Sequence, residues 1–415
     1  MKGLKHFANL YAERQYAEVV SQLSAIKIID RNLLSLRGIS YKALGKLAEA
    51  IADLEAAAED NQDTNIYTNL GNAYREVGNL KDSIKAYTVA ISSDNDNYNA
   101  HEAAGFAYFD TGNLTEATSA FKNCVRLKPD SDRAYYYLGE AFRKAGYIEE
   151  AKDSYSNSNF HLSRAQLLEC FYLTSTATEF LKHYASADKT SLRNPLAGSI
   201  IAHSNYYFET NIKDQYCQDP IKYIGTGEIS IVDKFSERDL KDVLKYIDSE
   251  TLDNRSQPLI TSGYQTAGNI FLTGNKSIKK LEECISRKIT QYRHSIGPSC
   301  GINKYFPSDY TLYGWAVNIT SGGNLNRHMH KEGWISGCVY LEIPHKKFDQ
   351  EGAICFTISN SNYPEAKDPP KEVTLSIKER MICLFPSSLH HGTIPFEGDG
   401  RRICIAFDII PKNKT

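Results

Sequence analysis

The sequence lacks several features, and each absence excludes a class of protein. No run approaches the roughly 18 consecutive apolar residues of a membrane-spanning helix, and no apolar segment with a cleavage site follows the first lysines. We therefore expect neither a membrane span nor a secretion signal. The nine cysteines are scattered and form no C-x-x-C pair, which favours reduced thiols over a disulfide framework or a zinc knuckle. These absences predict a cytoplasmic protein.

The chain also lacks an excess of either charge. It has 48 Lys and Arg against 50 Asp and Glu, a formal net charge of −2, and no long basic block. Binding to a phosphate backbone requires a concentrated basic face, so we do not expect nucleic acid as a partner. The length of 415 residues exceeds that of a typical single core and predicts two or three domains.

An internal repeat is present in the first 160 residues. Two sets of glycines and one set of aromatic residues recur at intervals of 33 or 34 residues. The sets are Gly38, Gly71, Gly105 and Gly139; Gly45, Gly78, Gly112 and Gly146; and Tyr41, Tyr74, Tyr108 and Phe142. A period of this length predicts a stack of helical hairpins, because one hairpin cannot bury its own apolar face.

Each repeated position has a physical role in such a hairpin. The first glycine lets helix A lie close to helix B, and the second ends helix A in a turn. A small residue stands where B crosses A, at Ala50, Ser83, Ala117 and Ala151. The pattern resembles the tetratricopeptide repeat (TPR) over about residues 5 to 158, and this resemblance implies a solenoid whose groove holds peptides or partner proteins. The other interpretation is that the repeats only scaffold or dimerise the chain.

The pattern changes twice after the repeats. Apolar residues at helical spacing predict a helical cap or bridge over residues 159–215. From about residue 228, two helices are followed by short β-branched or alternating runs at intervals of 8 to 14 residues. These runs predict an antiparallel jelly roll, or double-stranded β-helix, with backing helices. The expected fold is α+β, with domains at 1–158, 159–215 and 216–415.

Histidines and arginines gather in two stretches of the third domain. "RHMHKEGWISGCVYLEI" contains His328 and His330, and "FPSSLHHGTIPFEGDGRRICIAF" contains adjacent histidines followed by adjacent arginines. Two histidines one residue apart on an extended chain face the same side. A histidine followed two positions later by a second metal ligand, a later histidine, and a basic residue about ten positions beyond are the parts that a non-haem Fe(II) site with a dicarboxylate co-substrate needs.

The fragments "RHMH", "SGCVYL", "FPSSLHHGTIPF" and "RRICIAF" resemble the Fe(II)/2-oxoglutarate oxygenases of the prolyl-hydroxylase-like superfamily, in a bacterial H-x-H subgroup. The register of these motifs selects His391 over His390 and Arg402 over Arg401. The resemblance implies that His328, His330 and His391 bind Fe(II). It further implies that Arg402, Tyr340 and Asn318 contact 2-oxoglutarate, Asn318 because relatives have such a contact ten residues before the first metal ligand, with no catalytic residue beyond the metal ligands.

One position departs from the superfamily pattern. His330 occupies the position at which most members have Asp or Glu. A site with three histidines is more positive by about one unit charge and should hold Fe(II) less firmly. Imidazole binds metal only when neutral, so we expect affinity to fall as the pH drops from about 7.5 to 6. The alternative is that Glu332 or water supplies the third ligand beside His328 and His391.

The leading hypothesis is a 2-oxoglutarate-dependent dioxygenase that uses Fe(II) and O₂, is stimulated by ascorbate, and hydroxylates a protein or peptide recruited by the repeats. That recruitment step is an analogy. Two alternatives remain open: a scaffold whose barrel has lost catalysis, and a small-molecule oxygenase whose repeats serve assembly. The sequence does not name the substrate, the oxidised atom or the oligomeric state.

Overall fold

The computed structural model describes residues 3–27, 30–59, 63–249, 251–252, 254–255 and 257–412. The chain divides into two compact units. One holds the residues up to Phe160 with Glu250–Ser256 and Thr266–Gly274, and the other holds His161–Ser249, Gln257–Gln265 and Asn275–Thr415. The α+β class is confirmed. The division into 1–158, 159–215 and 216–415 stays a prediction, and residues 1 and 415 lie outside the described parts.

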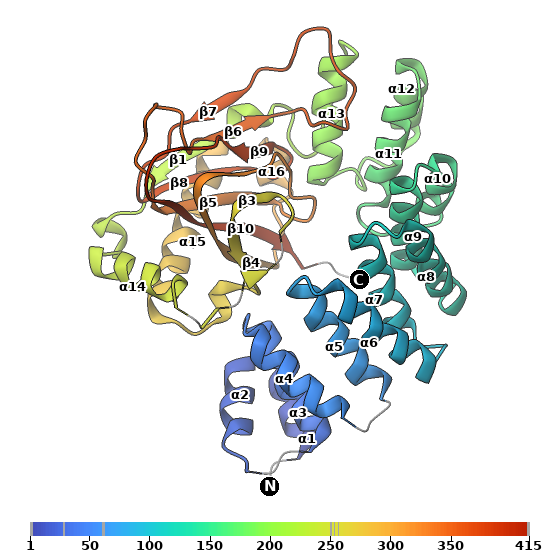
Figure 1. Cartoon of the computed structure of the whole chain (residues 1–415). Coiled ribbons are helices and arrows are strands. Elements are labelled where there is room, and N and C mark those ends of the chain that lie inside the picture. The colour runs from blue at the N-terminus through green and yellow to red at the C-terminus, as the bar shows by residue number, and fades with distance from the viewer. Residues whose placement is uncertain are drawn as a thin grey trace. The chain divides into compact units, whose positions relative to one another are not determined.

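The first unit is a series of helices, coloured blue to blue-green in Figure 1. Its helices are α1 (Leu4–Ala12), α2 (Tyr16–Ser24), α3 (Arg31–Ala43), α4 (Leu47–Ala58), α5 (Thr64–Glu76), α6 (Leu80–Ser93), α7 (Tyr98–Asp110), α8 (Leu114–Leu127), α9 (Asp132–Lys144) and α10 (Ile148–Ser156). The strand β2 (Asn254–Arg255) and the 3₁₀ turn η3 (Ile270–Leu272) belong to its two later segments. Helices α3, α5, α7 and α9 each begin after a residue whose side chain accepts a hydrogen bond from the first turn, at Asp30, Asp63, Asn97 and Ser131. Short polar side chains are favoured there because they satisfy otherwise unpaired N–H groups.

The roles predicted for the repeated residues are confirmed. A Cβ atom added to the first glycine of a repeat would meet the side chain of the following helix at 2.5 to 2.8 Å, for Gly38 on Leu54, Gly71 on Tyr87, Gly105 on Phe121 and Gly139 on Tyr155. The second glycines have φ between +77° and +85°, a conformation that ends helix A and that only glycine adopts freely. Ala50, Ser83, Ala117 and Ala151 are fully buried.

The second unit begins with helices and continues with strands. Its helices are α11 (Ser163–Thr174), α12 (Ala177–Ser186), α13 (Pro195–Tyr207), η1 (Pro220–Tyr223), η2 (Ile231–Asp233), α14 (Glu237–Ile247), α15 (Lys276–Ile296) and α16 (Gly301–Lys304). Its strands are β1 (Gly225–Glu228), β3 (Ile260–Thr266), β4 (Tyr310–Leu325), β5 (Ile335–Glu342), β6 (Ile354–Thr357), β7 (Val373–Leu375), β8 (Met381–Pro386), β9 (His390–Thr393) and β10 (Arg401–Pro411). Within the described residues, none of the helices combines the length and apolar character needed to cross a bilayer.

The strands form two antiparallel sheets. In this unit the larger sheet runs β1-β8-β5-β10-β4-β3, and the smaller runs β7-β6-β9. One apolar cluster joins Phe356 of the smaller sheet to Val317, Cys383 and Cys404 of the larger. The two sheets therefore share a core, and the side chains on their inner faces define the interior in which the candidate site lies.

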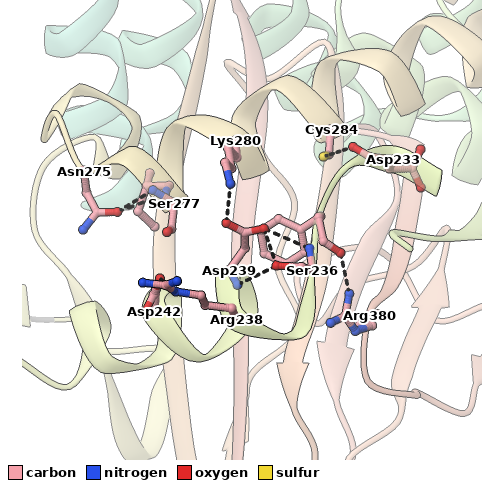
Figure 2. A network of polar contacts seen from close by, with 12 residues as sticks. Asp233, Ser236, Arg238, Asp239, Asp242, Asn275, Ser277, Lys280, Cys284 and Arg380 are labelled. Atoms are coloured by element: carbon pink, nitrogen blue, oxygen red, sulfur yellow. Dashed lines mark hydrogen bonds and ion pairs between the residues drawn. The ribbon is translucent and has the colours of Figure 1, made fainter. Parts of the chain in front are cut away.

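Polar contacts fix α14 and α15 beside the sheet, as Figure 2 shows. Ser236 and Asp239 form a capping box at the start of α14. Lys280 of α15 lies 2.6 Å from Asp239, and Arg380, in the turn before β8, donates to Glu237 at 2.7 Å. These bonds connect both helices with each other and with the strand, as expected of backing helices.

Candidate metal centre

Three histidine side chains converge at one end of the interior. His328, His330 and His391 each offer a ring nitrogen, and these three atoms lie within 4.8 Å of one another. The ring centroids of His328 and His391 are 4.5 Å apart, and His330 lies 5.0 Å from each of them. Three nitrogen donors this close, from one side, match the ligand arrangement of a non-haem metal site.

The backbone holds two of the three histidines in register. The N–H of His328 donates to the carbonyl of His391 at 3.0 Å, and the N–H of His391 donates to the carbonyl of His328 at 2.9 Å. Because directly opposed residues in an antiparallel bridge project to the same side, the two rings must face each other. His330 follows without regular strand structure, so its position is set by side-chain contacts.

Each ring uses Nδ1 in a hydrogen bond, and Nε2 of His328 lies 3.0 Å from Nε2 of His330. Nδ1 of His328 donates to the carbonyl of Asn326 at 2.8 Å, and Nδ1 of His391 donates to the carbonyl of Leu389 at 3.2 Å. Nδ1 of His330 lies 2.7 Å from Oδ1 of Asp408. Hydrogen bonds of this kind select the tautomer that ligates metal and are typical of metal-binding histidines.

Burial keeps two of the three rings, those of His328 and His391, neutral. Burial, and then the neighbouring ring of His330, lowers the pKa of His328 to about 4. Burial also lowers the pKa of His391 well below its usual value, with a smaller contribution from the other two rings. Metal binds the neutral form of imidazole, so the lowered pKa values of His328 and His391 keep these two rings in the binding form at pH 6.

A buried arginine, Arg402, lies on the inner face of β10. Arg402 is 3% exposed and donates to the carbonyl of Gly352 at 3.0 Å and to the hydroxyl of Tyr340 at 3.3 Å. Among the described residues no carboxylate pairs with it. A buried charge without an opposite charge is costly, so this guanidinium fits an anionic ligand.

Tyr340 adds a second donor at the same place. Its hydroxyl oxygen accepts from Arg402 and from the thiol of Cys338, at 3.3 and 3.2 Å. Burial raises the pKa of Tyr340 well above its usual value, so the phenol keeps its proton. With its oxygen accepting two bonds, that proton is available to donate to a ligand carboxylate.

The structure does not bring Asn318 to this place. Asn318 pairs with Ile403 across the strands, whereas Arg402 pairs with Ile319. Successive residues of a strand point to opposite faces, so Asn318 faces away from Arg402. Its amide donates to the hydroxyl of Tyr264 at 3.0 Å instead. The contact to 2-oxoglutarate expected of Asn318 is therefore not supported, because the expectation counted residues along the chain without the strand parity.

The neighbouring candidates lie elsewhere. His390 contacts Asn360 at 2.9 Å and Ser199 at 3.5 Å rather than the triad. Arg401 forms ion pairs with Asp248 and Glu342, at 2.6 and 2.8 Å. The structure thus brings together the residues that the motif register selects.

Glu332, the alternative third ligand, lies 2.7 Å from His161. Half of its side chain is exposed, and the described cluster of potential metal ligands contains His330 instead. The arrangement favours the three-histidine set over the alternative with Glu332.

The motifs do not predict the contacts that Asp408 and Ser336 make beside the triad. Asp408 lies 2.7 Å from His330, and the hydroxyl of Ser336 donates to the same carboxylate oxygen at 2.7 Å. A signal for Asp408 exists in "RRICIAFDII": it stands six positions after Arg402 in an apolar strand. An even spacing places both on the same face.

The donor set fits the cofactors that the motifs imply. Three imidazole nitrogens suit Fe(II) and leave room for further ligands. The guanidinium of Arg402, which has no carboxylate partner among the described residues, and the hydroxyl hydrogen of Tyr340 suit the distal carboxylate of a dicarboxylic 2-oxo acid. Arg402 and Asp408, the carboxylate beside His330, lie on the same inner face of β10. Arg402, Cys404, Ala406 and Asp408 alternate along this strand with residues that face the other way.

Comparison with known proteins identifies two parts of the chain. The family described as "Putative 2OG-Fe(II) oxygenase" matches residues 313–408. The family described as "TPR repeat" matches residues 71–112 and 105–146. No curated protein matches the sequence.

Several solved structures resemble part of the chain. "Crystal structure of MamA" has 23% identity and covers 35% of this chain and 82% of that chain, with a TM-score of 0.31. "MamA 41-end from Desulfovibrio magneticus RS-1" has 16% identity and covers 37% of this chain and 91% of that chain, with a TM-score of 0.35. Likenesses at this level carry no argument about function.

Proposed function

We propose that this protein, which carries a TPR repeat region and a 2OG-Fe(II) oxygenase domain, is an Fe(II)- and 2-oxoglutarate-dependent dioxygenase. We take its two sheets to form a jelly roll, which the strand orders β8-β5-β10-β4 and β7-β6-β9 support. The observation that carries the proposal is that the same domain contains both a histidine triad and a buried arginine, and that this arginine has no carboxylate partner among the described residues.

Two groups of residues in the interior would bind the metal and the co-substrate. His328, His330 and His391 would hold Fe(II) through Nε2. Arg402 and Tyr340 would bind the distal carboxylate of 2-oxoglutarate, the guanidinium by charge and the phenol by a hydrogen bond. Fixing the co-substrate at its far end orients its 2-oxo acid group toward the histidines, which is a positioning effect.

The surroundings of the triad would exclude water. The ring of Phe385 lies 4.7 Å from His391, and that of Phe356 lies 6.3 Å from it. The ring centroid of Trp315 lies 5.7 Å from that of His330. When bound, Fe(II) and 2-oxoglutarate supply an oxidation in which O₂ converts 2-oxoglutarate and a substrate C–H group to succinate, CO₂ and an alcohol. Ascorbate would support turnover by keeping the iron reduced.

We further propose that the repeat groove recruits a protein or peptide substrate. The support is the regular stacking of α3 to α10, with close glycine contacts in each repeat, since stacked hairpins present an extended concave surface. The nine cysteines are all free thiols, which supports a cytoplasmic location.

Anaerobic calorimetry tests the proposal. Metal-free protein is titrated first with Mn(II), as a surrogate that resists oxidation, and then with 2-oxoglutarate. We expect one metal per chain, followed by one 2-oxoglutarate that binds only after the metal. Binding of 2-oxoglutarate without metal, or no metal binding, would contradict the proposed function.

A further inference from the structure

Asp408 differs from every other partner of the triad. Its carboxylate is the only one among the described residues that hydrogen-bonds a ring of the triad, since His328 and His391 donate to backbone carbonyls. The distance from Oδ1 to Nδ1 of His330 is 2.7 Å. A negative charge therefore lies one imidazole ring away from the metal position.

The protein holds this carboxylate in place from several sides. Asp408 is 6% exposed and pairs with Ser336 across β10 and β5. The hydroxyl of Ser336 donates to Oδ1 at 2.7 Å, and it lies 2.7 Å from the hydroxyl of Ser387 and 3.3 Å from Nδ1 of His330. A Cβ atom added to Gly333 would lie 3.0 Å from the carboxylate carbon. The absence of a side chain at Gly333 therefore leaves the space that the carboxylate occupies.

The negative charge of Asp408 can compensate for the carboxylate ligand that is replaced by His330. A set of two histidines and a carboxylate places one negative charge directly on the ion, whereas three neutral imidazoles place none. A carboxylate that accepts from the far nitrogen of a ligating histidine raises the basicity of the ligating nitrogen and fixes the ring. Asp408 makes this contact with His330, the histidine that occupies the usual carboxylate position.

We propose that Asp408 is a positioning residue that supplies, through His330, the negative charge which a carboxylate ligand would otherwise supply. The inference rests on the proposed function, because it assumes that the triad binds metal. The role of Asp408 goes beyond the proposed function, because this residue lies outside the motif "RRICIAF" and would compensate for the charge of the missing carboxylate ligand.

A double-mutant cycle on metal affinity tests the inference. Dissociation constants for Mn(II) are measured anaerobically for the parent, Asp408→Asn, His330→Asp and the double variant. Asp408→Asn should weaken binding by about 10- to 100-fold in the parent background. In the His330→Asp background the same change should not weaken binding, because the new carboxylate binds metal directly and Asp408 becomes a like charge beside it.

The cycle separates charge compensation from a structural role. If Asp408→Asn weakens binding equally in both backgrounds, Asp408 only supports the fold and the inference fails. It also fails if Asp408→Asn binds within twofold of the parent, or if His330→Asp binds no metal. Asp309→Asn is the matched control, since Asp309 is exposed, pairs with Lys412 at 2.7 Å and should leave affinity unchanged.

Failure of the inference can be distinguished from failure of the proposed function. A parent that binds metal while Asp408→Asn binds equally well overturns only the role of Asp408. A parent that binds no metal overturns both. Circular dichroism monitors folding, and if Asp408→Asn does not fold, Ser336→Ala replaces it. Removing that hydroxyl should weaken Mn(II) binding by several-fold, and unchanged affinity would overturn the inference.

Discussion

Replacing Arg402 by methionine should separate the stability of the protein from its affinity for 2-oxoglutarate. Arg402 is buried, and no carboxylate among the described residues pairs with it. Its removal leaves the carbonyl of Gly352 without that donor, which costs about 1–3 kcal/mol. It also removes a buried charge whose desolvation costs several kcal/mol. The free energy of unfolding without ligands should therefore stay unchanged or rise.

The same substitution should greatly weaken co-substrate binding. Loss of a buried charged contact costs about 2–5 kcal/mol, which is about 25-fold or more in affinity. At a 2-oxoglutarate concentration of about 100 times the dissociation constant, the ligand should stabilise the Mn(II)-loaded parent by about 2.7 kcal/mol. At the same concentration, a 25-fold weaker variant would gain only about 1 kcal/mol.

Denaturant unfolding with and without 2-oxoglutarate, at fixed Mn(II), measures both effects. Arg401→Met is the matched control: it loses ion pairs with Asp248 and Glu342, each worth at most about 1 kcal/mol at a partly exposed site. It should keep the full stabilisation by ligand. The reasoning would be refuted if Arg402→Met kept that stabilisation, or if Arg401→Met lost it.

Four further predictions concern the triad and the repeats. His391→Ala should abolish metal binding, measured by elemental analysis after dialysis, whereas His390→Ala should retain it; the opposite result would place the metal on the other face of β9. Because the pKa values of His328 and His391 are depressed, metal affinity should fall much less between pH 7.5 and 6 than the about fiftyfold that three ordinary histidines would give; a fiftyfold fall in a metal titration would contradict this. The folded metal-free protein also binds fewer protons than the unfolded chain below the ordinary pKa of about 6.5, so its free energy of unfolding should decrease from there toward pH 4, and a constant value in denaturant titrations would be inconsistent with buried neutral rings. Gly105→Ala should destabilise the protein by about 1–3 kcal/mol, because the added Cβ would lie 2.7 Å from the ring of Phe121; an unchanged unfolding midpoint would contradict the close helix contact.

The repeat positions could be predicted because each depends on local physics. Glycines such as Gly71 and Gly78 have separate roles, one for space and one for a positive φ, and both recur with the period. The fold class follows from the change to strand periodicity in the same way. The triad could be anticipated from motif register, and its convergence depends on the bridge between His328 and His391.

The remaining features depend on which strands are neighbours. Asn318 was assigned by its distance along the sequence from His328, but the pairing of β4 with β10 turns it away from Arg402. Asp408 reaches His330 only because β10 lies beside β5 and the loop before β5 folds back at Gly333. Sequence periodicity gives the face of a residue within a strand, whereas contacts between distant segments require the sheet order.

Succinate formation tests the central claim most directly. Protein loaded with Fe(II) is supplied with 2-oxoglutarate, ascorbate and air, and succinate is quantified against the His391→Ala variant under the same conditions. The account predicts succinate that depends on both iron and the intact triad, at a slow uncoupled rate without substrate. Succinate no higher than that of His391→Ala, from parent protein that binds both Fe(II) and 2-oxoglutarate, would contradict an enzymatic role and favour a scaffold.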